Sequence, residues 1–309
     1  GVQTCALPIF LGAQITGGST SVRDGWEKLR VAGAQVREML RTAAAARWDV
    51  DLDQVKADKG MLTGPKGKKA TYGEMAEAAA RQAVPAAPAL KAPKDFKIVG
   101  KATKRLDTPA KTNGTAEFGL DVKLPGMVYA SLEQCPVIGG KVKSFDGAKA
   151  KAMPGVLDVV QINDGVAVVA NSYWQAAQAR KALKVEWDEG AVSSISTASM
   201  LAGNMQALSD GKVLPIGKPV GDVVKAMAGA AKTVKATYIT PMQAHAPLEP
   251  MNFIADFKNG KCILIGGTQF QQGAVGATAA VLGIKPEDIS VKTTFLGGGF
   301  GRRIELDFI

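Results

Sequence analysis

The chain has 309 residues, 46% of them hydrophobic and 21% charged, which fits an ordinary globular protein of about two domains. Its formal net charge is +10, but the 38 lysine and arginine residues are scattered, without an aromatic RNA-binding motif or zinc-finger spacing. The charge therefore fits an anionic cofactor, an acidic partner or a generally basic surface better than nucleic acid. Cys5, Cys135, Cys262 and the single His245 are too few and too far apart for an iron–sulfur cluster, a disulfide framework or a multi-histidine zinc site. No run reaches the roughly 18 apolar residues of a membrane span.

The first stretch, residues 1–9, does not look like part of a domain. It carries no charge, and it lacks the start methionine and basic region of a signal peptide. It looks like the translated adapter remnant found at the ends of gene fragments. We therefore assign it no structural meaning and expect the chain to be truncated at both ends.

Residues 10–85 are predicted to hold a turn, a long helix and a small hairpin. The turn has the sequence Gly17-Gly18-Ser19-Thr20-Ser21, and apolar residues with helical spacing follow from Trp26 to Leu40. Free N–H groups and the helix dipole converge at such a turn, which suits an anion. An ordinary Ser or Thr N-cap explains the same residues. A turn at 63–67 and a helix over 72–82 complete this region, and the Pro/Ala-rich residues 86–98 are predicted to be a linker.

The remaining sequence divides into three further segments. Residues 99–188 alternate short strands with turns, including strands on both sides of Leu124-Pro125-Gly126 and a hairpin at Asn163-Asp164-Gly165, and predict a compact α+β domain. Residues 189–222 have little periodicity and are expected to connect two domains. Residues 223–309 predict a helix, three strands, a second helix and a final strand, expected at 221–231, 233–239, 252–257, 262–265, 271–282 and 290–296.

The last predicted strand leads into the run Gly297-Gly298-Gly299-Phe300-Gly301, followed by Arg302 and Arg303. The spacing is neither a dinucleotide fingerprint, which would need glycine at 302, nor a Walker A loop. Glycine allows positive φ and lets a ligand touch the main chain, so successive N–H groups can form an anion-binding nest. A plain tight turn is the alternative.

Several ordered motifs resemble the molybdenum-binding subunit of the xanthine oxidase / aldehyde oxidase family, of the isoquinoline 1-oxidoreductase β-subunit type. They are "TGGSTSVR" at 16–23, "HAPLEPMN" at 245–252 and the tail from "GTQFQQG" to "GGGFGRR". Residues 100–131 resemble the opening of the family's α/β hammerhead domain. The resemblance covers residues 10–309 and implies an α+β fold, with a hammerhead domain at 99–188 between partial molybdenum-cofactor-binding domains at 10–85 and 223–309.

The resemblance also assigns cofactor-binding residues. Gln269 matches the glutamine that hydrogen-bonds an oxo ligand of molybdenum, and the loop from Gly298 to Gly301 matches the segment lining the metal centre. Arg302 lies beside that loop, where its donors suit a pyrophosphate or dithiolene-side oxygen. The turn from Gly17 to Ser21 matches one that faces the pterin or its cytosine dinucleotide. His245 and Glu249 are expected to form a buried hydrogen-bonded pair rather than a catalytic dyad.

Members of this family hydroxylate an N-heterocycle or an aldehyde with oxygen from water and pass the electrons to iron–sulfur clusters. The resemblance therefore implies molybdenum–molybdopterin cytosine dinucleotide and a separate [2Fe–2S] subunit. The family's glutamate base lies beyond Ile309, so the chain is expected to contain no catalytic residue and to be inactive alone, with Glu305 or Asp307 pairing instead with Arg302 or Arg303. Export to the periplasm is known among such relatives, but the sequence does not decide localisation. A nucleotide- or nucleic-acid-binding module and a noncatalytic paralogue are the alternatives.

Overall fold

The computed structural model describes residues 9–10, 13–211, 217–218 and 220–309. The stretch predicted to be an adapter remnant, residues 1–9, lies outside the described residues except for Ile9. The chain divides into two compact units. Unit 1 holds residues 1–122 and 245–309, and unit 2 holds residues 123–244.

Unit 1 is assembled from both ends of the chain. Its helices are α1 (Ser21–Trp48), α2 (Tyr72–Ala80), α3 (Thr108–Thr112) and α8 (Gln271–Leu282). Its strands are β1 (Ile9–Phe10), β2 (Ala13–Gln14), β3 (Lys56–Asp58), β4 (Met61–Thr63), β5 (Lys69–Thr71), β11 (Ile254–Lys258), β12 (Lys261–Gly266) and β13 (Ile289–Thr293). Short 3₁₀ turns connect several of these elements.

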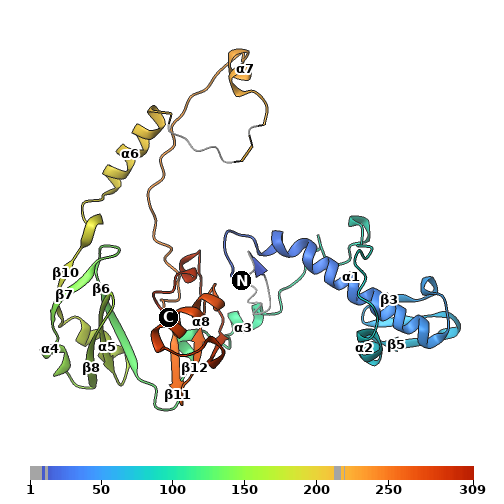
Figure 1. Cartoon of the computed structure of the whole chain (residues 1–309), viewed down its shortest axis with the longest axis horizontal. Coiled ribbons are helices and arrows are strands. Elements are labelled where there is room, and N and C mark those ends of the chain that lie inside the picture. The colour runs from blue at the N-terminus through green and yellow to red at the C-terminus, as the bar shows by residue number, and fades with distance from the viewer. Residues whose placement is uncertain (1–8, 11–12, 212–216, 219) are drawn as a thin grey trace. The chain divides into compact units, whose positions relative to one another are not determined.

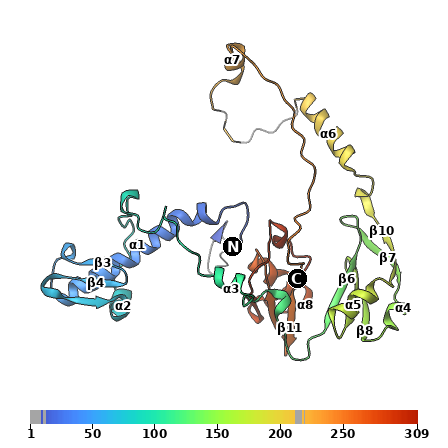
Figure 2. The same ribbon diagram turned by 180° about the vertical axis from the view of Figure 1, so that it is seen from behind.

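The C-terminal half of α1 carries the first core of unit 1. The small side chains of buried alanines at 43–45 let α1 pack closely with α2 and the antiparallel sheet β3–β4–β5, around Leu62 and Met75 (Figures 1 and 2). A capping box starts α2: Thr71 Oγ1 accepts from the Glu74 N–H at 3.1 Å, and the Glu74 carboxylate accepts from the Thr71 N–H at 2.6 Å. The predicted turn at 63–67 and helix over 72–82 are confirmed, and α1 extends further than predicted in both directions.

The segment predicted to be a linker, residues 86–98, follows the surface of α1. Three side chains of α1 donate hydrogen bonds to main-chain carbonyls in or next to this segment. Gln35 donates to Pro85 at 3.0 Å, Arg37 to Ala89 at 2.7 Å and Arg30 to Lys91 at 2.8 Å. The ring of Phe96 packs edge-on against Trp26, with 6.0 Å between centroids. These contacts hold the proline-rich residues within unit 1.

The second core of unit 1 lies in the three-stranded sheet β11–β12–β13. Strands β11 and β12 form an antiparallel hairpin, whereas β12 and β13 are parallel. Helix α8 makes the crossover between the parallel strands, as parallel pairing requires. It packs on the sheet through Ala274, against Leu264 and Ile289. The predicted helix over 271–282 is confirmed, including its end at Gly283 with a φ of 64°.

Unit 2 is a smaller α+β arrangement. Its helices are α4 (Ala148–Lys151), α5 (Tyr173–Arg180), α6 (Thr197–Ser209) and α7 (Val223–Ala228), and its strands are β6 (Tyr129–Gln134), β7 (Lys141–Asp146), β8 (Val156–Ile162), β9 (Gly165–Ala170) and β10 (Lys184–Asp188). The sheet β6–β9–β8 is antiparallel, and its helix-covered face buries Val168 against Ala150 of α4 and Ala179 of α5. The hairpin predicted at Asn163-Asp164-Gly165 is confirmed by β8 and β9.

Two predicted strands are wrong, and a helix forms where only a connection was expected. Residues 233–239 form no strand; Val234 and Tyr238 remain 81% and 90% exposed. Their alternating pattern suits a strand, but a strand needs a partner for its main-chain groups. Before the turn at Leu124-Pro125-Gly126, a 3₁₀ turn over Gly119–Asp121 replaces the other strand. Residues 189–222 include α6, whose start is capped by Ser196.

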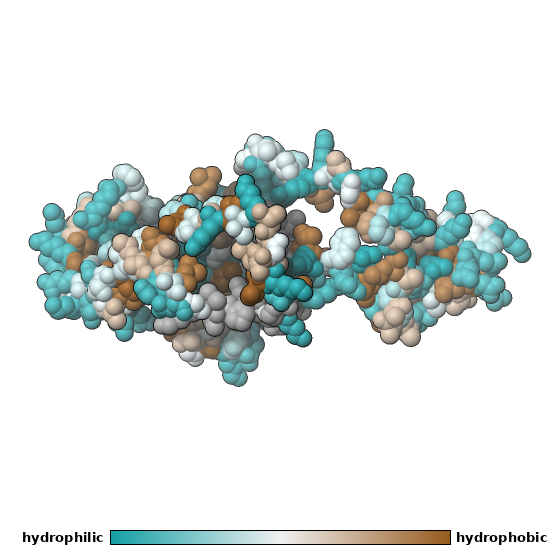
Figure 3. All heavy atoms as spheres, turned by 90° about the horizontal axis from the view of Figure 1, so that it is seen from above, coloured by the Kyte–Doolittle hydropathy of each residue, from teal (hydrophilic) through white to brown (hydrophobic). Residues whose placement is uncertain are grey.

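The described residues leave many apolar side chains at the surface. Brown apolar spheres lie among teal hydrophilic ones in Figure 3, and Val22, Leu29 and Val36 of α1 are each more than half exposed. None of the helices in the described part of the chain combines the length and apolar character that a membrane span requires.

The core around α2 supplies a stability test. Met75 is fully buried in it. We expect Met75→Ala to lower the free energy of unfolding of this part of unit 1 by about 2–5 kcal/mol, because truncation leaves a cavity. Hydrogen exchange of the α1 and α2 amides would measure the loss. Glu77→Ala, at an 85% exposed side chain of the same helix, is the control and should change protection little. Equal effects of the two substitutions would contradict this packing.

Candidate functional site

Two segments that leave the same edge of the β11–β12–β13 sheet meet in unit 1. Because β12 and β13 are parallel, their carboxyl ends share this edge. Gln269 follows β12, and the glycine loop, residues 297–301, follows β13. The Gly301 N–H donates to Oε1 of Gln269 at 3.2 Å. Gln269 and the glycine loop, both assigned to the cofactor by the resemblance, therefore lie together in the structure.

The glycine loop has positive φ angles at three of its five positions. Gly298 and Gly301 have φ values of 102° and 99°, and Phe300, although not glycine, has a φ of 55°. A side chain at Gly299 would collide with Oε1 of Gln269. The Phe300 side chain is 75% exposed. The loop is therefore tightly fitted on its inner side, while its aromatic ring faces outward.

Hydrogen bonds to three carbonyls fix the direction of the loop's amides. The Gly297 carbonyl accepts from the Glu249 N–H at 3.0 Å, and the Gly298 carbonyl accepts from Nε of Arg303 at 2.9 Å. The Gly299 carbonyl accepts from the Arg302 N–H at 2.8 Å. In a trans peptide the next N–H points the opposite way from the carbonyl.

The N–H groups of residues 298–300 are therefore turned away from these partners. No hydrogen bond among the described residues uses them. Gly299 is buried, and a buried N–H without an acceptor costs about 1–3 kcal/mol. Three successive amides without acceptors fit a bound anionic or oxygen-rich group.

The N-terminal turn lies against the same site, as predicted. The Thr16 N–H donates to the carbonyl of Gln269 at 2.8 Å, and Nε2 of Gln269 donates to the carbonyl of Thr16 at 2.7 Å. A methyl group at Gly17 would lie 3.0 Å from Cδ1 of Ile304, just beyond the glycine loop. The side-chain amide of Gln269 thus joins the turn to the loop.

The start of α1 does not show the ordinary N-cap that was the alternative explanation. Gly18 and Ser19 are both left-handed, with φ values of 58° and 54°. Thr20 is buried, and its hydroxyl donates back to the carbonyl of Gly17 at 2.6 Å without capping the helix. Ser21 is exposed at the first helical position. The first N–H groups of a helix have no acceptor inside it, so here they can donate hydrogen bonds to an anion.

A buried ion pair underlies the loop. Arg303 is fully buried and Glu249 is 7% exposed, with Nη2 of Arg303 2.8 Å from Oε2 of Glu249. The guanidinium also donates to the carbonyls of Gly298 and Gly267, both at 2.9 Å. Burial lowers the pKa of Arg303, and Glu249 acts against that shift by favouring the charged form.

Glu249 makes the complementary set of contacts. Its Oε2 accepts from the Gly297 N–H at 2.9 Å, and its Oε1 accepts from the Gly119 N–H at 3.1 Å and from Nδ2 of Asn252 at 3.0 Å. Arg303 and Glu249 were not predicted as a pair. One sequence feature could have indicated the pair: Glu249 is the single carboxylate of the otherwise uncharged stretch 241–254. A carboxylate that is buried needs a cation as its partner.

The structure corrects one expectation about charged residues. His245 and Glu249 are not a buried pair, because His245 is exposed and Glu249 binds Arg303 instead. Arg302 pairs with Asp307, since both its Nη atoms donate to the Asp307 carboxylate, at 2.7 and 2.6 Å. These bonds raise the pKa of Arg302. The pairing of Asp307 with Arg302 was predicted and is confirmed.

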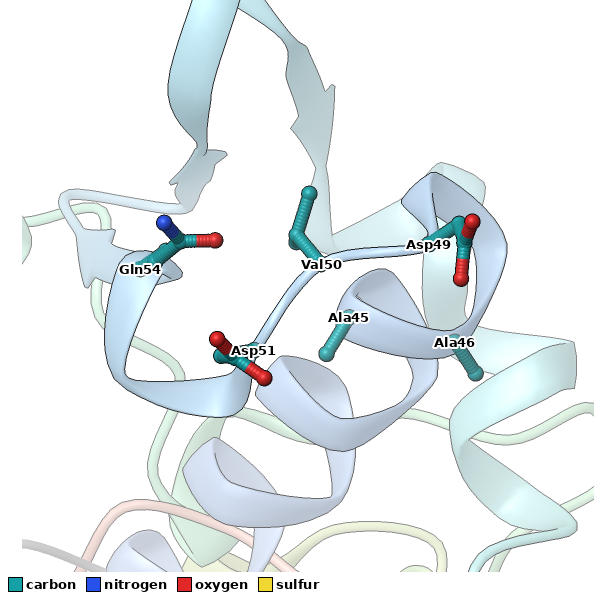
Figure 4. Close-up of a pocket in the computed structure, with 6 residues that line it drawn as sticks. All are labelled: Ala45, Ala46, Asp49, Val50, Asp51 and Gln54. Carbon is teal, nitrogen blue, oxygen red and sulfur yellow. The ribbon is translucent and has the colours of Figure 1, made fainter.

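A separate hollow of about 380 Å³ lies at the other end of α1 (Figure 4). It is lined by Ala45, Ala46, Asp49, Val50, Asp51 and Gln54. The carboxylates of Asp49 and Asp51 lie apart and do not converge on one point (Figure 4). The hollow therefore has neither the convergent polar groups nor the unpaired amides of the glycine-loop site.

Comparison with known proteins is consistent with this site. Residues 209–307 match the family described as Molybdopterin cofactor-binding domain. The chain is 31% identical to the β-subunit of isoquinoline 1-oxidoreductase from Brevundimonas diminuta, over 96% of this chain and 44% of that protein. It is 30% identical to a nicotinate dehydrogenase subunit from Pseudomonas putida, over 78% of this chain and 21% of that protein. The chain therefore belongs to the molybdenum-binding subunits of the xanthine oxidase family.

Two further similarities complete the comparison. Membrane-bound aldehyde dehydrogenase (pyrroloquinoline-quinone) from Gluconacetobacter polyoxogenes is 31% identical over 96% of this chain and 40% of that protein. Quinoline 2-oxidoreductase from Pseudomonas putida 86 is a solved structure with a TM-score of 0.48 and 20% identity, over 66% of this chain and 31% of that chain. The chain spans less than half the length of these relatives.

The two neighbouring arginines offer a matched test of the buried pair. We expect Arg303→Ala to lower the free energy of unfolding of unit 1 by about 3–5 kcal/mol, because it leaves Glu249 buried without a cation. Arg302→Ala removes a pair at the surface and should cost at most about 1 kcal/mol. Chemical denaturation followed by circular dichroism would measure both. If both substitutions lowered the free energy of unfolding by a similar amount, the assignment of Arg303 and Glu249 as the buried pair would be contradicted.

A glycine substitution tests the fit between the loop and Gln269. We expect Gly299→Ala to displace the Gln269 side chain and break its bond with the Gly301 N–H, because the added methyl group has no room. The Gly301 amide should then exchange at least about tenfold faster, the equivalent of 1.4 kcal/mol. Gly276→Ala is the control, since nothing lies within 4 Å of the added atom. Unchanged exchange in the Gly299 variant would contradict the contact.

Proposed function

We propose that the chain forms part of the molybdopterin-binding subunit of a molybdenum hydroxylase that oxidises an N-heterocycle or an aldehyde. The observation that carries the proposal is the row of unpaired amides at residues 298–300, fixed beside Gln269 at one edge of the β11–β12–β13 sheet. Relatives named for isoquinoline, nicotinate and aldehyde substrates support the two substrate classes. When bound, the cofactor supplies the hydroxylation of an electron-poor carbon with oxygen from water.

The chain's own residues would hold the cofactor in three ways. The amides of Gly298, Gly299 and Phe300 would donate to oxygen atoms of the group. Nε2 of Gln269 carries two hydrogens and gives one to Thr16, so the second can be donated to an oxo ligand. The exposed ring of Phe300 would form an apolar wall beside the substrate. Gly301 allows the loop to turn back under that ring.

We further propose the cytosine dinucleotide form of the cofactor. The turn at Gly17, Gly18, Ser19, Thr20 and Ser21 is joined to Gln269 through Thr16, and its α1 amides suit a pyrophosphate. Arg302 would contribute positive charge, and the guanidinium hydrogens that Asp307 does not use could be donated to the pyrophosphate. The β6–β9–β8 sheet with α4 and α5 is proposed as part of the hammerhead domain.

The proposal includes a [2Fe–2S] subunit as electron acceptor, because Cys5, Cys135 and Cys262 cannot supply a cluster with four thiolates. The base that the family uses is not assigned to any residue of this chain. Asp307 is not proposed for that role, since its carboxylate is bound by Arg302. Glu305 is not proposed either, because the resemblance matches it to no base.

The test is metal analysis of the full-length subunit that contains this sequence, produced together with its iron–sulfur partner. We expect about one molybdenum atom per subunit and oxidation of an N-heterocycle or an aldehyde. Gln269→Ala should lower molybdenum content or turnover by about 10–100-fold, the usual effect of losing a residue that orients a metal's ligands. Gln206→Ala, an exposed glutamine of α6, is the control and should leave both unchanged.

Other results would support a different function. Phosphate-dependent binding of nucleotides without molybdenum would favour a nucleotide-binding module. Bound pyrroloquinoline quinone in place of molybdenum would favour the cofactor named for one relative. A folded complex that binds no cofactor and oxidises no substrate would identify a noncatalytic paralogue.

A further inference from the structure

The single histidine of the chain lies beside the glycine loop but has no part in the site as described so far. A methyl group at Gly301 would lie 3.6 Å from Nε2 of His245. Pro247 packs on Gly298, and the Glu249 N–H donates to the carbonyl of Gly297. Residues 245–249 therefore cross the loop in the opposite direction, with His245 over its far end.

The imidazole is available for a ligand. His245 is exposed, and no hydrogen bond or ion pair of the described residues involves its side chain. The charged groups of the elements packed around it are already engaged. Arg302 binds Asp307, and Arg303 binds Glu249 on the same segment as His245. Glu305, which follows the turn after the loop, acts on the charge of Arg302. The imidazole of His245 takes part in neither of the two pairs.

We infer that His245 binds, in its protonated form, the oxyanion held by the amides of residues 298–300. This inference rests on the proposed function, because it takes the loop to be an anion site. Protonated histidine donates from both ring nitrogens and adds a positive charge. The N–H groups of the loop are neutral donors, so the imidazolium would be the charged contact of the site. Anion binding is then stronger at acidic pH, where the imidazole carries a proton, than at alkaline pH.

The chain makes this pH dependence easy to isolate. The chain has one histidine, and histidine is the residue type whose side chain usually changes charge between pH 5 and 8. An exposed contact between opposite charges is worth up to about 1 kcal/mol, or roughly a fivefold change in affinity. The histidine resonances in an NMR spectrum also come from one residue.

The experiment measures sulfate binding to the 309-residue chain, because sulfate keeps its two charges over this pH range. We expect wild type to bind about fivefold more tightly at pH 5.5 than at pH 8, and sulfate to move the titration midpoint of the histidine resonances to higher pH. His245→Gln should bind weakly at both pH values. His245→Lys should bind tightly at both, because its charge does not change. Met242→Gln, at a 75% exposed side chain nearby in sequence, is the control and should behave as wild type.

The outcomes separate this inference from the proposed function. Equal pH dependence in wild type and His245→Gln, with sulfate bound by both, would overturn the role of His245 and leave the anion site intact. No sulfate binding by any folded variant, checked by circular dichroism, would overturn the anion site and the inference together. Cytidine diphosphate at one fixed pH distinguishes the sources of the oxyanion. Binding more than tenfold tighter than sulfate assigns it to a nucleotide-bearing cofactor, and equal binding assigns it to a free oxyanion.

Discussion

The candidate site depends on a charge that has been moved out of water. Arg303 has no exposed surface, and its guanidinium is surrounded by the Glu249 carboxylate and by main-chain carbonyls from three places in the sequence. An isolated buried cation would cost several kcal/mol, so the guanidinium is stable there only when all these acceptors are in place. The exit of β12, the glycine loop and the segment around Glu249 must therefore fold together. The loop's shape follows from this requirement.

The same pair determines which groups the loop offers to a ligand. Each carbonyl from Gly297 to Gly299 is held on the inner side, and the planar trans peptide turns the following N–H away from it. The site thus presents main-chain donors whose positions do not depend on side-chain rotamers. This kind of recognition suits a large oxygen-rich cofactor, since amides carry no net charge and need no deprotonation. The loop tolerates no side chain at Gly299, because the space beside it is occupied by Oε1 of Gln269.

Local sequence signals predicted most of the regular structure. The apolar spacing of α1, the helix over 72–82, the hairpin at 163–165 and the end of α8 were all predicted, because each depends on residues within a few positions. The strand expected at 233–239 failed for the same reason. Its pattern is local, but a strand is stable only with a partner that the local pattern does not contain.

The sequence by itself determined the family, the glycine loop and the residues that motif matching could reach, such as Gln269 and the turn at Gly17. Only the tertiary structure decided which arginine is buried, since Arg302 and Arg303 are neighbours with the same chemistry. Arg303 lies inside because the 3₁₀ turn after Gly301 directs it toward Glu249, 54 residues earlier, while Arg302 reaches Asp307 at the surface. Burial and pairing are properties of contacts between distant residues, so no local pattern contains them.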